Sequence, residues 1–212
     1  MPQLEDKFSL ALAWALALFV SAVSFVAWGS GNFWRFGHLS PYQIFPLLGL
    51  LAFGLMWTHY IIGTLRDLYH VKAETLKPYY FWTGYIVLVL ICLHPGLLIY
   101  QLYRDGFGLP PVSYESYVAP GLAWVAMLGT ASLLVFLAFE LRRWFGGKPW
   151  WHYVVDLSDL AMLAIVYHGL RLGSQLHSGW YRYVWWLFAI MLIVVLIRKY
   201  YLRLQANQKA QS

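Results

Sequence analysis

The chain has 212 residues, of which 61% are hydrophobic and only 11% are charged. Ordinary soluble domains carry about 25% charged residues, and a soluble fold of this size could not bury so much apolar surface. The net charge of +6 is spread along the chain and forms no basic stripe, so we expect no nucleic-acid partner. Composition therefore predicts an all-α integral membrane protein, with one domain over residues 1–212 in contact with membrane lipid.

Uncharged stretches predict a bundle of six transmembrane helices, because about 20 mostly apolar residues cross the hydrocarbon layer of a membrane. The fifth stretch is the most polar of the six, since it carries Asp156 and Asp159. Glycine and proline residues punctuate the loops between the stretches. The predicted helices cover residues 8–28, 43–64, 79–103, 118–139, 153–172 and 180–197.

Lysine and arginine residues predict the orientation of this bundle. Eleven of them fall on the side that holds both termini, and the other side has four, namely Arg35, Arg104, Arg171 and Arg182. Basic residues concentrate in cytoplasmic loops. We therefore expect both termini to lie in the cytoplasm.

Two histidines fall at matched depth in the outer half of the bilayer. His94 follows Pro78 by 16 residues on the predicted third helix, a rise of roughly 24 Å. His168 follows Tyr153 by 15 residues on the fifth, a rise of roughly 22 Å. Both helices run outward, so the two imidazoles suit the axial positions of one heme b. The alternative is that each histidine makes a helix–helix hydrogen bond.

Two arginines fall near these histidines on the outer side. Arg171 lies three residues after His168, and Arg104 follows the predicted third helix. Either guanidinium suits a heme propionate. Both residues also fit the simpler role of interfacial anchors.

Polar residues are predicted in the inner half as well. His59 on the second helix and Asp156 and Asp159 on the fifth lie at similar depth. These side chains suit a structural cluster in which they hydrogen-bond one another, or a quinone or proton site in which a base accepts protons. His59 and His152 form an alternative heme pair.

Short motifs add a family resemblance. Trp82-Thr83-Gly84-Tyr85, Leu93-His94-Pro95, Lys148-Pro149-Trp150-Trp151-His152 and Val166-Tyr167-His168 resemble the ferric reductase-like transmembrane domain family. In layout the chain is most similar to the bacterial heme-binding membrane subunit of the periplasmic methionine sulfoxide reductase system, and more distantly to NADPH oxidases and six-helix metalloreductases. The resemblance implies that His94 and His168 ligate an outer heme in a multi-pass protein of the bacterial inner membrane.

The sequence departs from this family at the inner heme. Members with two hemes carry a second histidine 13 or 14 residues earlier on each helix, where this chain has Tyr80 or Phe81, and Val154 or Val155. One heme is therefore implied. By analogy with the metalloreductases, the inner half could hold FMN, FAD or a quinone instead.

The expected function is that of a cytochrome b electron-transfer subunit. Electrons would come from a separate cytoplasmic flavoprotein or a quinol, because the sequence has no nucleotide-binding motif, and would go to a periplasmic redox partner or another outer acceptor. Two alternatives remain, namely a proton-coupled transporter that uses His59, Asp156 and Asp159, and a heme-free scaffold subunit of a membrane complex.

Overall fold

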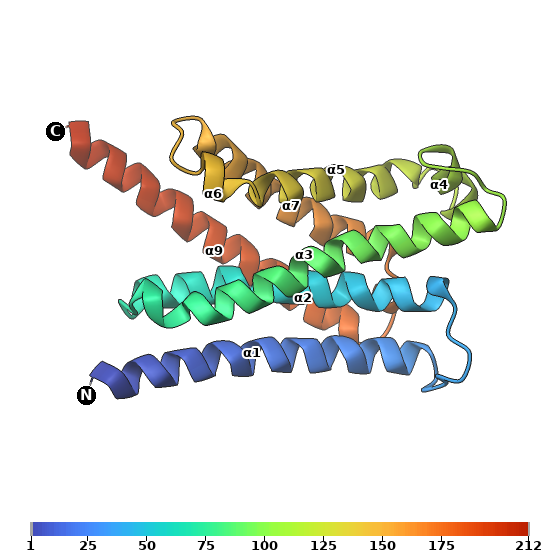
Figure 1. The fold of residues 1–212 in the computed structure, drawn as a ribbon, viewed down its shortest axis with the longest axis horizontal. Helices are drawn as coiled ribbons and strands as arrows, with labels where there is room; N and C mark the ends of the chain where they lie inside the picture. The colour runs from blue at the N-terminus through green and yellow to red at the C-terminus, as the bar shows by residue number, and fades with distance from the viewer. Residues whose placement is uncertain (1, 212) are drawn as a thin grey trace.

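The computed structural model describes residues 2–211, and within that range its regular elements are all helices. Figure 1 shows them in chain order. They are α1 (Pro2–Gly31), α2 (Pro41–Leu68), α3 (Ala73–Arg104), α4 (Val112–Tyr117), α5 (Ala123–Phe139), α6 (Arg142–Phe145), α7 (Trp151–Leu172), α8 (Ser174–His177) and α9 (Trp180–Gln211).

The long helices are built to cross a membrane. Among the described residues, α1, α2, α3, α7 and α9 are long and apolar enough to do so, and α5 is a shorter apolar helix of 17 residues. Large apolar side chains point outward, including Phe19, Ile190 and Ile197, which are 64%, 57% and 64% exposed. Such a surface suits lipid and not water. The chain is therefore a multi-pass membrane protein.

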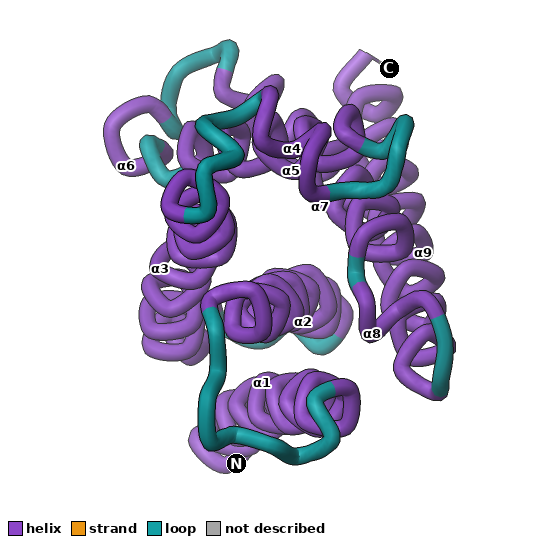
Figure 2. Tube along the Cα trace, turned by 90° about the vertical axis from the view of Figure 1, so that its right-hand side faces the viewer, coloured by secondary structure: helices purple, strands orange, loops and turns teal. Residues whose placement is uncertain are grey.

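The helices alternate in direction along the bundle. The start of α1 and the end of α9 lie at the same end (Figure 1). Seen end-on, α2 occupies the centre and packs on α1, α3 and α9, while α5 packs on α7 (Figure 2). The pairs α2/α3 and α5/α7 carry the candidate site residues His59, His94 and His168.

An aromatic core joins α2 to α9. The rings of Phe53 and Trp185 stack with centroids 4.1 Å apart, and those of Trp57 and Phe188 lie 4.5 Å apart. Trp57 Nε1 also donates to the Phe188 carbonyl oxygen at 2.9 Å. Large buried rings dominate core energetics. This core therefore holds α2 against α9.

The predicted helices agree with the structure in order, but several starts were wrong. α1 begins at Pro2 and α3 at Ala73, whereas these helices were predicted from residues 8 and 79. The fourth helix was predicted over residues 118–139, but α5 begins at Ala123. Pro120 lacks an amide hydrogen, and Gly121 has a φ of +78°. Both features prevent a helix from starting earlier. The last predicted helix, 180–197, continues in the structure to the end of α9.

Candidate cofactor site

A cavity of about 470 Å³ lies between α2, α3, α5 and α7. Pockets that hold small molecules and cofactors have volumes of roughly 300–1,000 Å³ and mostly apolar walls. The walls here are largely aliphatic and aromatic, with Leu50, Phe53 and Trp185 among them. His94 and His168 both line this cavity, which we call the outer cavity. The structure thus brings together the two histidines that were predicted to act as a pair.

His94 on α3 is held by the neighbouring helix α2. Its Nδ1 lies 2.7 Å from the carbonyl oxygen of Phe45. A carbonyl oxygen only accepts, so Nδ1 carries the hydrogen, and in the neutral ring the lone pair is on Nε2. Gly49 lies against the same ring, since a Cβ there would be 2.7 Å from His94 Cε1.

His168 on α7 is held by α5 in the same way. Its Nδ1 donates to the carbonyl oxygen of Val125 at 2.9 Å. A Cβ on Gly129 would be 2.6 Å from His168 Cε1. In both cases the accepting carbonyl and the glycine are four residues apart, hence one above the other on one helix face.

The two histidines therefore have the same tautomer, with the lone pair of the neutral ring on Nε2, and both rings line the outer cavity. Among the described residues neither His94 Nε2 nor His168 Nε2 has a hydrogen-bond partner. A histidine that donates through one ring nitrogen is fixed in orientation and more basic at the other. Within residues 2–211 no group of three or more His, Cys, Asp or Glu side chains could hold a bare metal ion. Two imidazoles suit a heme, because the macrocycle supplies the equatorial ligands.

The two arginines predicted as propionate partners occupy different places. Arg171 lines the outer cavity, whereas Arg104 is exposed at the end of α3 and does not line it. His177 of α8 also lines the cavity and donates from Nε2 to the Arg171 carbonyl oxygen at 3.2 Å. Arg171 is thus the arginine placed to meet an anionic group at the rim.

A carboxylate next to this rim joins α2 to α3. Asp105 accepts a hydrogen bond from Gln101 Nε2 at 2.8 Å and one from the Tyr42 hydroxyl at 2.7 Å. The two hydrogen bonds, that from Gln101 first, lower the pKa of Asp105 below its ordinary value. Tyr42 itself lines the outer cavity.

A second cavity of about 420 Å³ lies beside the first, towards the end of the bundle where the chain starts and ends. We call it the inner cavity. Met56, Ile91 and Phe136 line both cavities. These three side chains are therefore a shared wall between the two spaces.

His59 lines the inner cavity and bonds to α3. Its Nε2 lies 2.7 Å from the Thr83 hydroxyl oxygen, and that hydroxyl donates to the Tyr79 carbonyl oxygen at 2.6 Å. A hydroxyl has one hydrogen, so Thr83 accepts from His59 Nε2–H. The lone pair of the neutral ring is then on Nδ1, which has no hydrogen-bond partner among the described residues.

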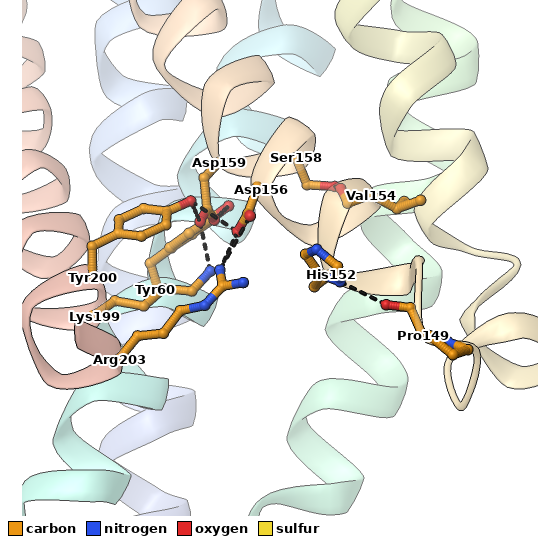
Figure 3. Close-up of polar contacts among 10 residues, drawn as sticks. All are labelled: Tyr60, Pro149, His152, Val154, Asp156, Ser158, Asp159, Lys199, Tyr200 and Arg203. Atoms are coloured by element: carbon orange, nitrogen blue, oxygen red, sulfur yellow. Dashed lines mark hydrogen bonds and ion pairs between the residues drawn. The ribbon is translucent and has the colours of Figure 1, made fainter. Parts of the chain in front are cut away.

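The two carboxylates of α7 bond to other partners (Figure 3). Asp159 pairs with Lys199 of α9 at 2.5 Å and accepts from Tyr60 at 3.0 Å. Asp156 pairs with Arg203 of α9 at 2.9 Å. The predicted cluster in which His59, Asp156 and Asp159 hydrogen-bond one another is therefore wrong. His59 and Asp159 nevertheless line the same cavity.

The positions where two-heme members of the resembled family carry their inner histidines hold other residues here. Tyr80 and Val155 line the inner cavity, so no imidazole pair stands there. His152 is exposed, bonds to the Pro149 carbonyl oxygen at 2.6 Å and lines neither cavity. His59 and His152 are thus not brought together, and His59 is the one histidine that lines the inner cavity among the described residues.

Sequence reasoning missed the glycines and the carbonyl acceptors. Gly49 and Gly129 are single glycines in apolar stretches, which is ordinary in membrane helices. Their role depends on which helix faces which, and nothing local in the sequence states that. Comparisons with protein-family models, with curated proteins and with solved structures find no match for this chain.

Proposed function

We propose that this chain is a six-span membrane cytochrome b that carries electrons across a bacterial inner membrane through one heme. The five helices that are long and apolar enough to cross a membrane, together with the shorter apolar helix α5, would make up the six proposed spans. Eleven Lys and Arg residues against four favour cytoplasmic termini. The end of α3 and the end of α7, with the outer cavity, would then face the periplasm.

The paired histidine geometry is the observation that carries this proposal. His94 and His168 each donate Nδ1–H to a carbonyl oxygen of a neighbouring helix, at 2.7 and 2.9 Å. Both remaining ring nitrogens are left to one apolar cavity. A helix–helix hydrogen bond alone, the simpler alternative, would need neither a cavity that both rings line nor a glycine against each ring.

The residues present fit a heme b. His94 and His168 would bind its iron, Gly49 and Gly129 leave room for the two rings, and Arg171 would pair with a propionate. Bound heme supplies reversible one-electron chemistry. The chain's own side chains set the ligand orientation and exclude water, because the cavity walls are mostly apolar.

The proposed donor is a separate flavoprotein or a quinol on the inner side, and the proposed acceptor is a periplasmic redox partner. We propose on the basis of the motifs around His94 and His168 that the chain belongs to the ferric reductase-like transmembrane domain family.

Heme content of purified variants tests the assignment. We expect His94→Ala and His168→Ala each to abolish heme binding, because one axial bond is lost in each. His152→Ala is the matched control, since His152 is exposed and lines neither cavity. Heme retained at the wild-type level in either cavity variant would refute the ligand assignment.

A further inference from the structure

We propose that the outer face of the molecule around α8 is the docking surface for the electron acceptor, and that this acceptor is a redox protein with an acidic surface. Such a surface serves electron transfer only if the outer cavity holds a heme, so the docking role rests on the proposed function. The electrons would leave the chain at α8, and the partner that receives them is identified by its charge.

Two short helices cover the outer end of the outer cavity. α4 contributes Tyr114 and Tyr117 to the cavity wall, and α8 lies in the run of residues 171–177, all of which line the cavity. In that run Arg171 and His177 are exposed as well, so one layer of residues separates the cavity from the outer side. The same is true at α4, where Tyr117 is 40% exposed. The two covers therefore differ in another property.

Charge distinguishes the two covers. Three arginines surround α8, namely Arg35 from the loop after α1, Arg171 of α7 and Arg182 of α9. The segments 28–40 and 160–185, which hold them, contain no aspartate or glutamate. Within the described part of the chain none of the three arginines is in an ion pair. We call these arginines together with α8 the basic surface.

The α4 side carries the opposite balance of charge. Arg104, Asp105 and Glu115 are exposed there, which makes two carboxylates against one guanidinium. Figure 2 looks onto this end of the bundle and shows α8 beside α9, apart from α4. An acidic partner is thus attracted to the basic surface and repelled from the α4 side.

Hydrogen bonds hold two of the arginines at α8. Arg182 Nη1 donates to the His177 carbonyl oxygen at 2.9 Å, and His177 Nε2 donates to the Arg171 carbonyl oxygen at 3.2 Å. Between them the Leu176 side chain is fully buried in the core that joins α2 to α9. The two guanidinium groups are therefore carried by an ordered part of the chain.

The loop after α1 brings Arg35 to the same end of the molecule. A Cβ on Gly31 would be 3.5 Å from Gln175 Cγ, so the end of α1 lies against α8. The Arg35 amide donates to the Asn32 carbonyl oxygen at 3.0 Å, in a turn directly after α1. Phe33 in this turn is 81% exposed. Arginine and aromatic side chains are enriched in protein interfaces, which favours a protein over a small ion as the partner.

The step at the basic surface is the transfer of one electron. Ferrous heme in the outer cavity becomes ferric, the oxidised partner gains the electron, and no bond or proton is exchanged. Opposite charges raise the rate of encounter, and added salt lowers it because mobile ions screen exposed charges. The acceptor should therefore carry acidic side chains around its own redox centre.

Binding of two redox proteins of opposite charge tests the basic surface without using electron transfer. The full-length protein is placed, with its outer face outward, in vesicles of phosphatidylcholine, a lipid without net charge. Plastocyanin is the acidic probe and cytochrome c the basic one, and bound probe is measured after the vesicles are sedimented at low ionic strength. We expect plastocyanin to bind and to be released by salt. Binding of cytochrome c in preference to plastocyanin would overturn the inference.

Arginine variants locate this binding. We expect the double variant Arg35→Gln with Arg182→Gln to bind plastocyanin about 10-fold more weakly, the lower end of the range for electrostatic steering. Neither arginine lines a cavity, so heme content should be unchanged, and a glutamine at position 182 can still donate to the His177 carbonyl oxygen. Arg104→Gln is the matched control, because Arg104 is an exposed arginine on the α4 side. Equal binding by the double variant and this control would contradict the assigned surface.

Oxidation of the reduced protein then tests the electron exit. The vesicles are reduced with dithionite, freed of its excess and mixed with plastocyanin or with ferricyanide, a small anion. We expect plastocyanin to oxidise the double variant about 10-fold more slowly than the wild type at low ionic strength, and equally fast at high ionic strength. If the double variant slows ferricyanide and not plastocyanin, the docking of a protein is overturned. Plastocyanin binding does not require heme, so a failure of the cytochrome proposal is distinguishable from a failure of the docking surface.

Discussion

His94 Nδ1 lies 2.7 Å from the carbonyl oxygen of Phe45, one helix away. This bond fixes the ring tautomer, because a carbonyl oxygen cannot donate. It leaves the lone pair of the neutral ring on Nε2, the atom that would bind the proposed heme iron, and His168 repeats the arrangement through Val125 at 2.9 Å. Two helix pairs thus present two equivalent imidazoles to one cavity.

The glycines behind the rings should be required for this arrangement. We expect Gly49→Ala and Gly129→Ala each to weaken heme binding about 10- to 100-fold, the range seen when partners that orient a ligand are disturbed. The reason is steric, since each Cβ would be under 3.0 Å from a histidine ring. Heme titration of the purified apoproteins measures the effect.

Gly63→Ala is the control for these variants. Gly63 is on α2 like Gly49, but a Cβ there would be 3.7 Å from the nearest atom, the Tyr80 hydroxyl oxygen. It should bind heme as the wild type does. Unchanged affinity in both Gly49→Ala and Gly129→Ala would show that the rings are not held in this way.

The ion pair between α7 and α9 should stabilise the fold. In Lys199→Met the Asp159 side chain, 5% exposed, loses its charged partner. We expect the free energy of unfolding to fall by about 2 kcal/mol, the scale of a hydrogen bond to a charged group. Thermal unfolding in detergent measures it, and Lys199→Met with Asp159→Leu should recover much of the loss.

Arg203→Met is the comparison for that ion pair. The Arg203–Asp156 pair is 43% and 31% exposed, so its loss should change stability by less than about 1 kcal/mol. If Arg203→Met lowered the free energy of unfolding more than Lys199→Met does, the conclusion that the Lys199–Asp159 pair is the more buried of the two would be contradicted.

The rim carboxylate predicts a pH dependence. Hydrogen bonds from Gln101 and Tyr42 lower the pKa of Asp105 in the folded protein. A lowered folded-state pKa gives stability that is present above the unfolded value of about 3.9 and is lost as the pH falls through the folded value. Tyr42→Phe should therefore have a lower unfolding temperature than the wild type at neutral pH, and this difference should become smaller as the pH falls.

Unfolding temperatures measured from about pH 7 to about pH 3 check this dependence. Tyr100→Phe is the control, because Tyr100 is 58% exposed and has no hydrogen bond among the described contacts. A difference in unfolding temperature between Tyr42→Phe and the wild type that grows as the pH falls would contradict this prediction.

The helices and the histidine pair could be predicted from the sequence of each helix alone, whereas the side-chain contacts between helices could not. Rise per residue and run length placed His94 and His168 at one depth, because both quantities depend on a single helix. The partner of His59 is Thr83 on the next helix, and the partners of Asp156 and Asp159 are on α9. Those contacts depend on how the helices are arranged around α2, which the hydropathy pattern does not state. The start of α5 depended on two residues, Pro120 and Gly121, inside an otherwise apolar run.

The heme content and optical spectrum of the purified wild-type protein test the cytochrome proposal most directly. We predict one heme b per polypeptide, with the sharp reduced-minus-oxidised bands of a low-spin iron that has two imidazole ligands. Protein that is folded, as judged by its helical circular dichroism, and that neither contains heme nor binds added heme would contradict the account.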